Sequence, residues 1–311
     1  MSRIVLGTRG SDLARAQTAM VQSALARVSP EIESAVEIIT TRGDENSGRA
    51  AEPTDRRAGR KGLFTSEIER ALRERQIDVA VHSAKDLPSD ASDGLEICAA
   101  LPRAAAEDVL IAKRCADFDA LPPNAVIGTG SVRRQHQLRW LRPDLELVDL
   151  RGNVPTRLRK LVANSWDGIV LARAGLERLG FDCSRGALSF EGALLRSSIL
   201  PREKFLPAGG QGIVALQVRA DDHAIRSVIS ALSDDDTLLC LRAEREFLRQ
   251  LQGDCGTPVG VLAAIQNGTM TMHAQFFAEG AAEPSVATTR GNIAQIEPEA
   301  LGATLLELIN G

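Results

Sequence analysis

The sequence contains no tyrosine, and aromatic residues make up only 3% of its 311 positions. Proteins that bind single-stranded nucleic acids stack bases on exposed aromatic rings, so this composition disfavours that class. The net charge of −4 also disfavours it, because affinity for nucleic acid depends on an excess of basic side chains. We therefore expect no nucleic-acid partner.

Cysteine is scarce, odd in number and widely spaced, with no Cys-x-x-Cys pair. This pattern excludes a disulfide framework and a zinc knuckle, and predicts reduced thiols. The four histidines are scattered without the paired spacing that metal sites use, so we expect no metal. The five cysteines are Cys98, Cys115, Cys183, Cys240 and Cys255.

No apolar run approaches membrane-spanning length, and the first residues enter an apolar stretch without a charged-then-apolar leader. These features predict a cytoplasmic protein that does not contact a membrane. Neither a Walker loop nor a dinucleotide fingerprint is present. The glycine-rich residues 209–212 instead predict a tight turn near a domain crossing.

Arginine is abundant where lysine is not: only five of the 37 basic residues are lysines. Arginine binds carboxylates and phosphates through two parallel hydrogen bonds, so the bias toward arginine is typical of an anionic ligand site. Biased base composition of the genome explains it equally well when it is taken alone. The positions of the arginines along the chain distinguish a ligand site from biased base composition.

A strand–turn–helix unit occurs twice. Residues 3–8 predict a strand, residues 7–11 a turn, and apolar residues at helical spacing follow from Leu13. Residues 125–128, 129–131 and 132–135 repeat this order, which predicts two similar α/β lobes. Further predicted strands at 77–82, 95–100, 145–150 and 168–172 alternate with helical segments and favour mostly parallel sheets.

The pattern changes from Ser233 onward. One amphipathic helix is followed by a hairpin whose Asn267-Gly268 turn separates residues 259–265 from 269–276, and a helix is predicted over 300–309. These elements predict a third, smaller α+β domain. Residues 45–60 lack apolar periodicity and predict a mobile surface loop, either a lid or a linker.

Polar residues 82–88 follow the apolar strand 77–81, so they project from a carboxyl strand end, where open α/β sheets bind ligands. Asp86 could there exchange protons or stabilise a developing cation. The alternative is a solvated ion pair between Lys85 and Asp86. His82 by itself is more typical of a satisfied, half-buried histidine.

Basic residues follow other predicted strands, beside helix starts whose free N–H groups favour anions. They predict a two-walled carboxylate or phosphate site, although a single arginine in a turn is usually only solvated. The basic residues are Arg9, Arg133, Arg134, Arg151 and Arg157, and the helix starts carry Ser11, Thr129 and Ser131.

Cys255 lies in a glycine-flanked loop, residues 253–258, after the amphipathic helix. The loop predicts an accessible thiol, open to a covalent role or merely incidental. Asp254 would raise the thiol pKa by like-charge repulsion.

In this order, these groups resemble the porphobilinogen deaminase (hydroxymethylbilane synthase) family. The matching stretches span almost the whole chain: residues 7–11, 41–44, 61–64, 81–88, 128–135, 150–157, 206–212 and 255–260. The sequence departs from the family pattern at Asp254, at Gly130 and in a longer 45–60 loop.

The resemblance implies two lobes like those of periplasmic binding proteins with an active-site cleft between them, followed by the α+β domain that carries the cofactor cysteine. The implied bounds are 1–101 plus 201–220, 102–200, and 221–311. The implied reaction condenses four porphobilinogen molecules, with loss of ammonia, into hydroxymethylbilane. The implied enzyme is a monomer.

The resemblance also implies a role for each site residue. Asp86 would be catalytic, stabilising the azafulvene cation that forms as ammonia leaves. Cys255 would hold a covalent dipyrromethane cofactor. The implied cofactor contacts are Ser83, Lys85, Thr129, Ser131, Arg133 and Arg134, and the implied substrate contacts are Arg9, Ser11, Phe64, Arg151, Arg157, Arg178 and Gln211.

Two other functions fit less well. A solute-binding protein of similar lobes would need no thiol and would usually carry an export signal. A catalytically silent relative is disfavoured because both Asp86 and Cys255 are present.

Overall fold

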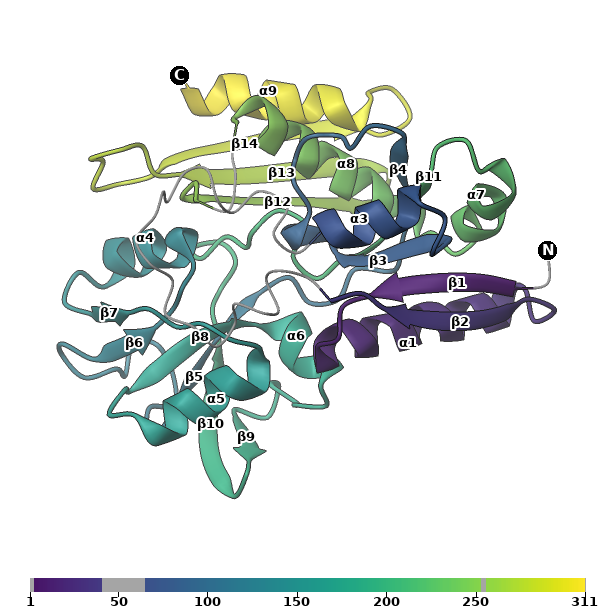
Figure 1. The fold of residues 1–311 in the computed structure, drawn as a ribbon. Helices are drawn as coiled ribbons and strands as arrows, with labels where there is room; N and C mark the ends of the chain where they lie inside the picture. The colour runs from purple at the N-terminus through teal and green to yellow at the C-terminus, as the bar shows by residue number, and fades with distance from the viewer. Residues whose placement is uncertain (1–2, 41–64, 253–255, 311) are drawn as a thin grey trace.

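A computed structural model gives the fold, and residues 3–40, 65–252 and 256–310 are described here. Strands of these residues form three β-sheets. Figure 1 shows the first sheet on the right, the second at the lower left and the third across the top. The α/β fold class predicted from the sequence is confirmed.

The first sheet has five strands, and a short 3-10 helix, η2, follows β3 directly. Helices α1, α3 and α7 belong to this sheet. In spatial order the strands are β2 (Glu33–Ile38), β1 (Arg3–Thr8), β3 (Val79–Ser83), β11 (Val214–Arg219) and β4 (Leu95–Ala100). The helices are α1 (Asp12–Val28), α3 (Ser66–Arg73), η2 (Ala84–Asp86) and α7 (His223–Ser230).

The second sheet has six strands, with helices α4, α5 and α6 following β6, β7 and β8 in the chain. In spatial order the strands are β7 (Glu146–Val148), β6 (Val126–Gly128), β8 (Gly168–Ala172), β5 (Asp108–Ala112), β10 (Ala193–Ile199) and β9 (Ala187–Phe190). The helices are α4 (Val132–Leu141), α5 (Val154–Ala163) and α6 (Arg173–Arg178).

The two sheets share one strand order, which confirms the prediction of two similar lobes. In the first sheet, β11 lies next to β3 in the order β2-β1-β3-β11, and it follows the second lobe in the chain. In the second sheet, β5 lies next to β8 in the order β7-β6-β8-β5, and it follows the first lobe in the chain. Both β11 and β5 pair antiparallel with both neighbours. The expectation of mostly parallel sheets is therefore wrong, because the chain crosses between lobes in the opposite direction.

A repeated side-chain contact also marks the duplication. Asp78, just before β3, accepts a hydrogen bond from the backbone N–H of Val5 through Oδ2 at 2.9 Å. Asp167, just before β8, accepts from Val126 N–H at the same distance. In the first lobe this hydrogen bond ties the start of β3 to β1, and in the second lobe it ties the start of β8 to β6. The same side-chain contact thus supports the register of the parallel pair in both lobes.

The third sheet is the hairpin β12 (Val259–Gln266) and β13 (Thr269–Phe276) with β14 (Ser285–Asn292), covered by α8 (Asp235–Gln250) and α9 (Pro298–Asn310). Asn267 and Gly268 have φ of 51° and 73°, the left-handed geometry of the predicted hairpin turn. The two helices pack closely at Gly302, where a Cβ would lie 2.6 Å from the Ala243 carbonyl oxygen. The α+β character of this part is as predicted.

The three domain bounds stay predictions. Helix α7 packs on the core of the first sheet through Ile225 and Ile229, and Leu232 joins the same cluster. This packing favours a start for the third unit after Leu232 rather than at residue 221.

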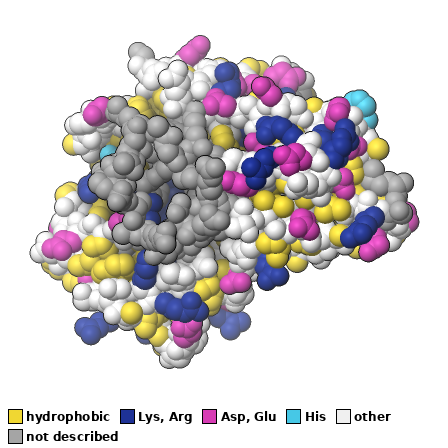
Figure 2. All heavy atoms as spheres, in the orientation of Figure 1, with side chains coloured by type: hydrophobic (Ala, Val, Ile, Leu, Met, Phe, Trp, Pro, Cys, Tyr) yellow, Lys and Arg dark blue, Asp and Glu magenta, His cyan; other side chains and the backbone are white. Residues whose placement is uncertain are grey.

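Charged side chains of both signs alternate over the described surface facing the viewer in Figure 2. No helix in the described part of the chain is long and apolar enough to cross a membrane.

Candidate functional site

Lys85 and Asp86 lie in η2, directly after β3, as the sequence predicts. The Lys85 ammonium donates to Gln211 Oε1 at 3.4 Å, and among the described contacts it has no ion pair with Asp86. Burial and then the charge of Arg134 lower the pKa of Lys85 to about 8, while Asp86 and Asp108 oppose the shift. The alternative of a solvated Lys85–Asp86 ion pair is therefore wrong.

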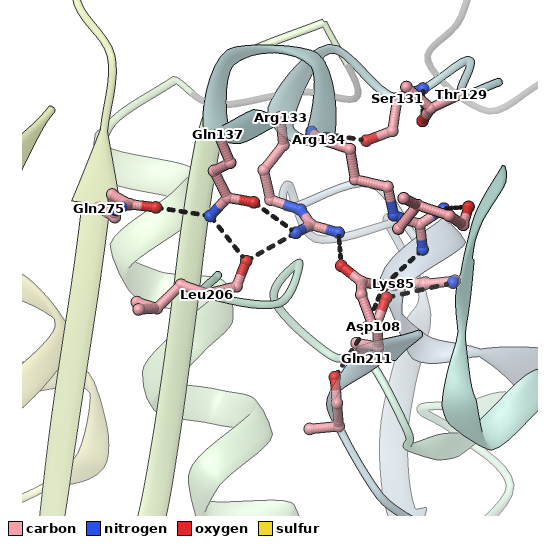
Figure 3. Close-up of polar contacts among 12 residues, drawn as sticks. Lys85, Asp108, Thr129, Ser131, Arg133, Arg134, Gln137, Leu206, Gln211 and Gln275 are labelled. Carbon is pink, nitrogen blue, oxygen red and sulfur yellow. Dashed lines mark hydrogen bonds and ion pairs between the residues drawn. The ribbon is translucent and has the colours of Figure 1, made fainter. Parts of the chain in front are cut away.

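The structure reveals a residue that the sequence analysis missed, Asp108 at the start of β5. Its side chain is fully buried. Its carboxylate accepts from Arg133 Nη2 at 2.8 Å, Arg134 Nη2 at 2.6 Å and Gln211 Nε2 at 2.9 Å (Figure 3). The two arginines hold the pKa of Asp108 far below its usual range, although burial alone would raise it.

Arg133 and Arg134 extend from the first turn of α4 and are each only 5% exposed. Arg133 Nη1 also donates to Gln137 Oε1 at 2.9 Å and the Leu206 carbonyl at 2.6 Å, and Arg134 Nη1 to the Val170 carbonyl at 2.7 Å. Their Nε atoms are buried without a hydrogen-bond partner in the described structure. Contact of these arginines with a ligand stays a prediction.

Arg157 and Arg178 are half-buried cations near the same site. Burial and then Arg134 lower the pKa of Arg157 to about 10, and Asp86 opposes the shift, so all three charges lie within electrostatic reach. Arg178 donates through Nη2 to the Gly212 carbonyl at 2.7 Å. Arg151, by contrast, is exposed and pairs with Asp149 at 2.8 Å.

Helix starts bring hydroxyl groups to the same strand ends. Ser11 caps α1 by accepting from Ala14 N–H, and Ser131 caps α4 by accepting from Arg134 N–H. Thr129 is buried and accepts from Ser131 N–H at 3.3 Å. These residues order the turns whose N–H groups the sequence analysis singled out.

Other predicted residues of the first lobe lie at the ends of β1 and β3. Ser83 ends β3 and exchanges hydrogen bonds with the buried amide of Gln17 on α1. Arg9 follows β1 and is half-buried.

The glycine-rich turn brings Gln211 against η2. Gly210 has φ of 72°, and a Cβ there would lie 2.9 Å from the Lys85 backbone nitrogen. Gly212 has φ of 87°, and a Cβ there would lie 2.5 Å from the Ala104 carbonyl oxygen. Only glycine permits this approach. The tight turn predicted at a domain crossing is confirmed.

His82 is buried and hydrogen-bonded to Gln217 Oε1 at 3.1 Å. Burial lowers its pKa to about 4, so it is neutral at physiological pH. The prediction of a satisfied histidine is confirmed, although the side chain is fully buried rather than half-buried.

Three of the four described thiols are kept in the protonated, weakly nucleophilic form by burial. Burial raises the pKa of Cys98 and Cys183 to about 11 and that of Cys240 to about 12. Cys115 is half-buried and free. Cys255 and Phe64 lie outside the described residues. No group of His, Cys, Asp and Glu in the described ranges could hold a metal ion.

Two hollows, with volumes of about 300 and 250 Å³, are lined in part by residues 87–92, which follow η2, and by helix α8. Arg245 lines both. They contain none of the predicted site residues.

Comparison with known proteins identifies the family of this chain. The family model for the dipyrromethane cofactor-binding domain of porphobilinogen deaminase matches residues 4–227, and that for its C-terminal domain matches 238–310. This chain belongs to the porphobilinogen deaminase family.

Individual members of the porphobilinogen deaminase family are similar over most of their length. The protein of Roseiflexus sp. (strain RS-1) is 45% identical over 269 residues, covering 86% of this chain and 84% of that protein. That of Roseiflexus castenholzii is 39% identical over 304 residues, covering 98% and 94%. Among solved structures, the methionine-binding protein MetQ is 11% identical, with a TM-score of 0.44 and coverage of 76% and 92%.

The described site fits the cofactor that the porphobilinogen deaminase model names. Arg133 and Arg134 pair with one internal carboxylate, Asp108, and Lys85 joins this cluster through Gln211, so the cluster holds more positive than negative charge. Arg157 adds a further half-buried cation. Burying this excess is unfavourable unless an anion arrives. A pyrrole oligomer that carries carboxylates supplies that charge.

Proposed function

We propose that this chain joins porphobilinogen units, with loss of ammonia, into hydroxymethylbilane, using a dipyrromethane attached to Cys255. The observation that carries the proposal is that Asp86 lies within electrostatic reach of both Lys85 and Arg157. Lys85 follows β3 of the first lobe, and Arg157 follows β7 of the second lobe. A half-buried carboxylate among cations, not paired with any of them in the described structure, suits a substrate whose carboxylates are anionic and whose pyrrole ring becomes cationic while it reacts.

The cations bind and orient. Each pyrrole unit carries two carboxylates, and arginine binds a carboxylate through two parallel hydrogen bonds. We assign this role to Arg9, Arg151, Arg157 and Arg178, with Lys85, Arg133 and Arg134 nearer the cofactor. Ser11, Ser83, Thr129 and Ser131 add short donors at the helix starts, and Phe64 and Gln211 complete the predicted contacts.

Asp86 acts on charge and protons. When ammonia departs from porphobilinogen, the remaining pyrrole carries a positive charge, and a fixed carboxylate stabilises it without reorganising. The same carboxylate can accept and return protons at pyrrole nitrogen. When bound, the dipyrromethane supplies the pyrrole carbon to which the first incoming unit is joined.

The high thiol pKa values of Cys98, Cys183 and Cys240 support Cys255 as the attachment point. We further propose that the enzyme is a cytoplasmic monomer that acts without nucleic acid or membrane.

Intact mass of the purified chain tests the proposal. We expect it to exceed the sequence mass by two porphobilinogen units less the two ammonia molecules lost, together with a pyrrole colour in an Ehrlich-type assay. Cys255→Ala should lack both, whereas the matched variant Cys115→Ala should keep both. Wild-type protein that makes hydroxymethylbilane without this added mass would refute the covalent cofactor, and loaded protein that makes none would refute the activity.

A further inference from the structure

The buried carboxylate of Asp108 connects four segments that are distant in sequence. It lies at the start of β5, where the chain crosses into the second lobe. Its partners are Arg133 and Arg134 from α4 and Gln211 from the turn that precedes β11, where the chain crosses back. Gln211 in turn accepts from Lys85 of the first lobe (Figure 3).

The amide of Gln211 has one orientation in this network. Its Nε2 donates to the Ala106 carbonyl at 2.7 Å and to Asp108 at 2.9 Å, and both partners are acceptors. Its Oε1 must therefore face the opposite way, toward Lys85 Nζ. The position of the Lys85 ammonium thus depends on an acceptor that Asp108 orients.

We propose that Asp108 is a positioning residue that holds Gln211 and Arg134 so that the Lys85 ammonium stays charged and aimed at the carboxylates of the ligand. This inference rests on the proposed function. Asp108 itself touches no ligand, because its two oxygens are occupied by Arg133, Arg134 and Gln211.

The charge balance supports the proposal. Lys85 lies near Arg133 and Arg134, which disfavour its protonated form, and near Asp86 and Asp108, which favour it. Replacing Asp108 with a neutral residue removes one favourable charge and leaves both arginines without their shared anion. Loss of the Asp108 charge by itself also lowers the pKa of Lys85, so the positioning through Gln211 is tested separately, with the Asp108 charge kept in place.

The scarcity of lysine makes this measurable. The chain has only five lysines, so ¹³C-dimethyl-lysine resonances can be assigned by substitution and titrated one by one. All variants carry Cys255→Ala, so that none differs in cofactor loading. Lys113, Lys160 and Lys204 serve as internal references, because none of their hydrogen bonds to described residues joins them to this cluster.

We expect Asp108→Asn to lower the pKa of Lys85 by about one unit or more, since an opposite charge at close range shifts a pKa by this order. The reference lysines should not move. Asp78→Asn is the matched control, because Asp78 also pairs with a buried arginine, Arg219, and accepts a backbone N–H, but in the first lobe. It should leave Lys85 unchanged. An unmoved Lys85 in folded Asp108→Asn protein would overturn the proposal.

Gln211→Leu tests the positioning step with the Asp108 charge in place, whether or not Asp108→Asn folds. It leaves both Asp108 ion pairs in place and removes the amide that joins them to Lys85, together with its hydrogen bond to the Ala106 carbonyl. We expect folded protein with some loss of stability, because the Ala106 carbonyl and Asp108 each lose a donor. We also expect a lower pKa of Lys85 and, in the chain with Cys255 restored, a raised KM for porphobilinogen. Folded protein with both values unchanged would contradict the proposal.

The outcomes separate this inference from the proposed function. A lowered pKa of Lys85 in a chain that makes no hydroxymethylbilane would retain the positioning role and reject the activity. An active chain in which neither substitution changes the pKa of Lys85 would retain the activity and reject the positioning role.

Discussion

The guanidinium of Arg103 and the carboxylate of Glu244 form a buried ion pair that joins the third unit to the crossing between the lobes. The Arg103 Nη1 to Glu244 Oε1 distance is 2.6 Å. Arg103 Nε also donates to the Gln211 carbonyl at 2.9 Å, and Glu244 accepts from the N–H groups of Gly210 and Ala263. Helix α8 is therefore bonded to the turn that presents Gln211 to Lys85.

Glu244→Gln should lower the free energy of unfolding by about 3–5 kcal/mol, because it leaves the Arg103 charge buried without its partner. Urea unfolding followed by circular dichroism measures this. The matched control is Glu191→Gln, whose pair with Arg159 has side chains 53% and 58% exposed, and which should cost less than about 1 kcal/mol. Equal losses in both variants would contradict the importance of burial.

Local signals predicted most of the elements. The repeated turn and helix starts at Ser11 and Ser131 predicted both lobes, and Asn267-Gly268 predicted the hairpin, because caps and turns depend on neighbouring residues alone. The exchange of β5 and β11 between lobes could not be predicted, because short apolar runs do not reveal which sheet they join or in which direction.

The site was predicted in part for the same reason. Position after a strand identified Asp86 and Lys85, but the partners of an arginine are set by tertiary contacts. Asp108 was missed because an acidic residue before an apolar strand is ordinarily solvated. Here two arginines fold over it, so Arg133 and Arg134 are buried rather than projecting freely.

Arg133 and Arg151 should therefore respond differently to replacement by leucine. Arg133→Leu removes one of two cations from buried Asp108, so we expect a stability loss of about 3–5 kcal/mol. Arg151→Leu should leave stability almost unchanged, because Arg151 is exposed, but should weaken kcat/KM by about 1.5–3 kcal/mol through lost charge-assisted hydrogen bonds. Arg151→Lys should restore only part of this. Unfolding curves measure the stability of both leucine variants, and steady-state kinetics measure their kcat/KM. Normal kinetics for Arg151→Leu would reject a role of Arg151 in substrate binding.

Lys85→Met should stabilise the cofactor-free Cys255→Ala chain at pH 7 by up to about 3 kcal/mol, while abolishing its function once Cys255 is restored. The folded-state pKa of Lys85, about 8, lies below the ordinary 10.5, so the folded chain resists protonation more than the unfolded chain does. The cost of charging Lys85 is fully present below pH 8 and disappears as pH rises toward 10.5. The advantage of Lys85→Met in urea unfolding should shrink over that window, and an advantage that is constant with pH would contradict this account.

Asp86→Asn should nearly abolish tetrapyrrole formation in protein that remains folded. The substitution keeps the size of the side chain and its hydrogen bonding but removes its charge and proton exchange. Because the carboxylate matters most when positive charge develops on the departing substrate, the loss should fall on turnover more than on substrate binding. Asp86→Glu keeps the charge but displaces it, so measurable residual activity is expected. The decisive measurement is single-turnover deamination of porphobilinogen by chain loaded with cofactor from preformed hydroxymethylbilane, with loading verified by intact mass, so that failed assembly does not imitate a catalytic defect. Deamination at the wild-type rate by loaded Asp86→Asn would show that the carboxylate is structural, and the positive charge of the reacting pyrrole would then need another partner.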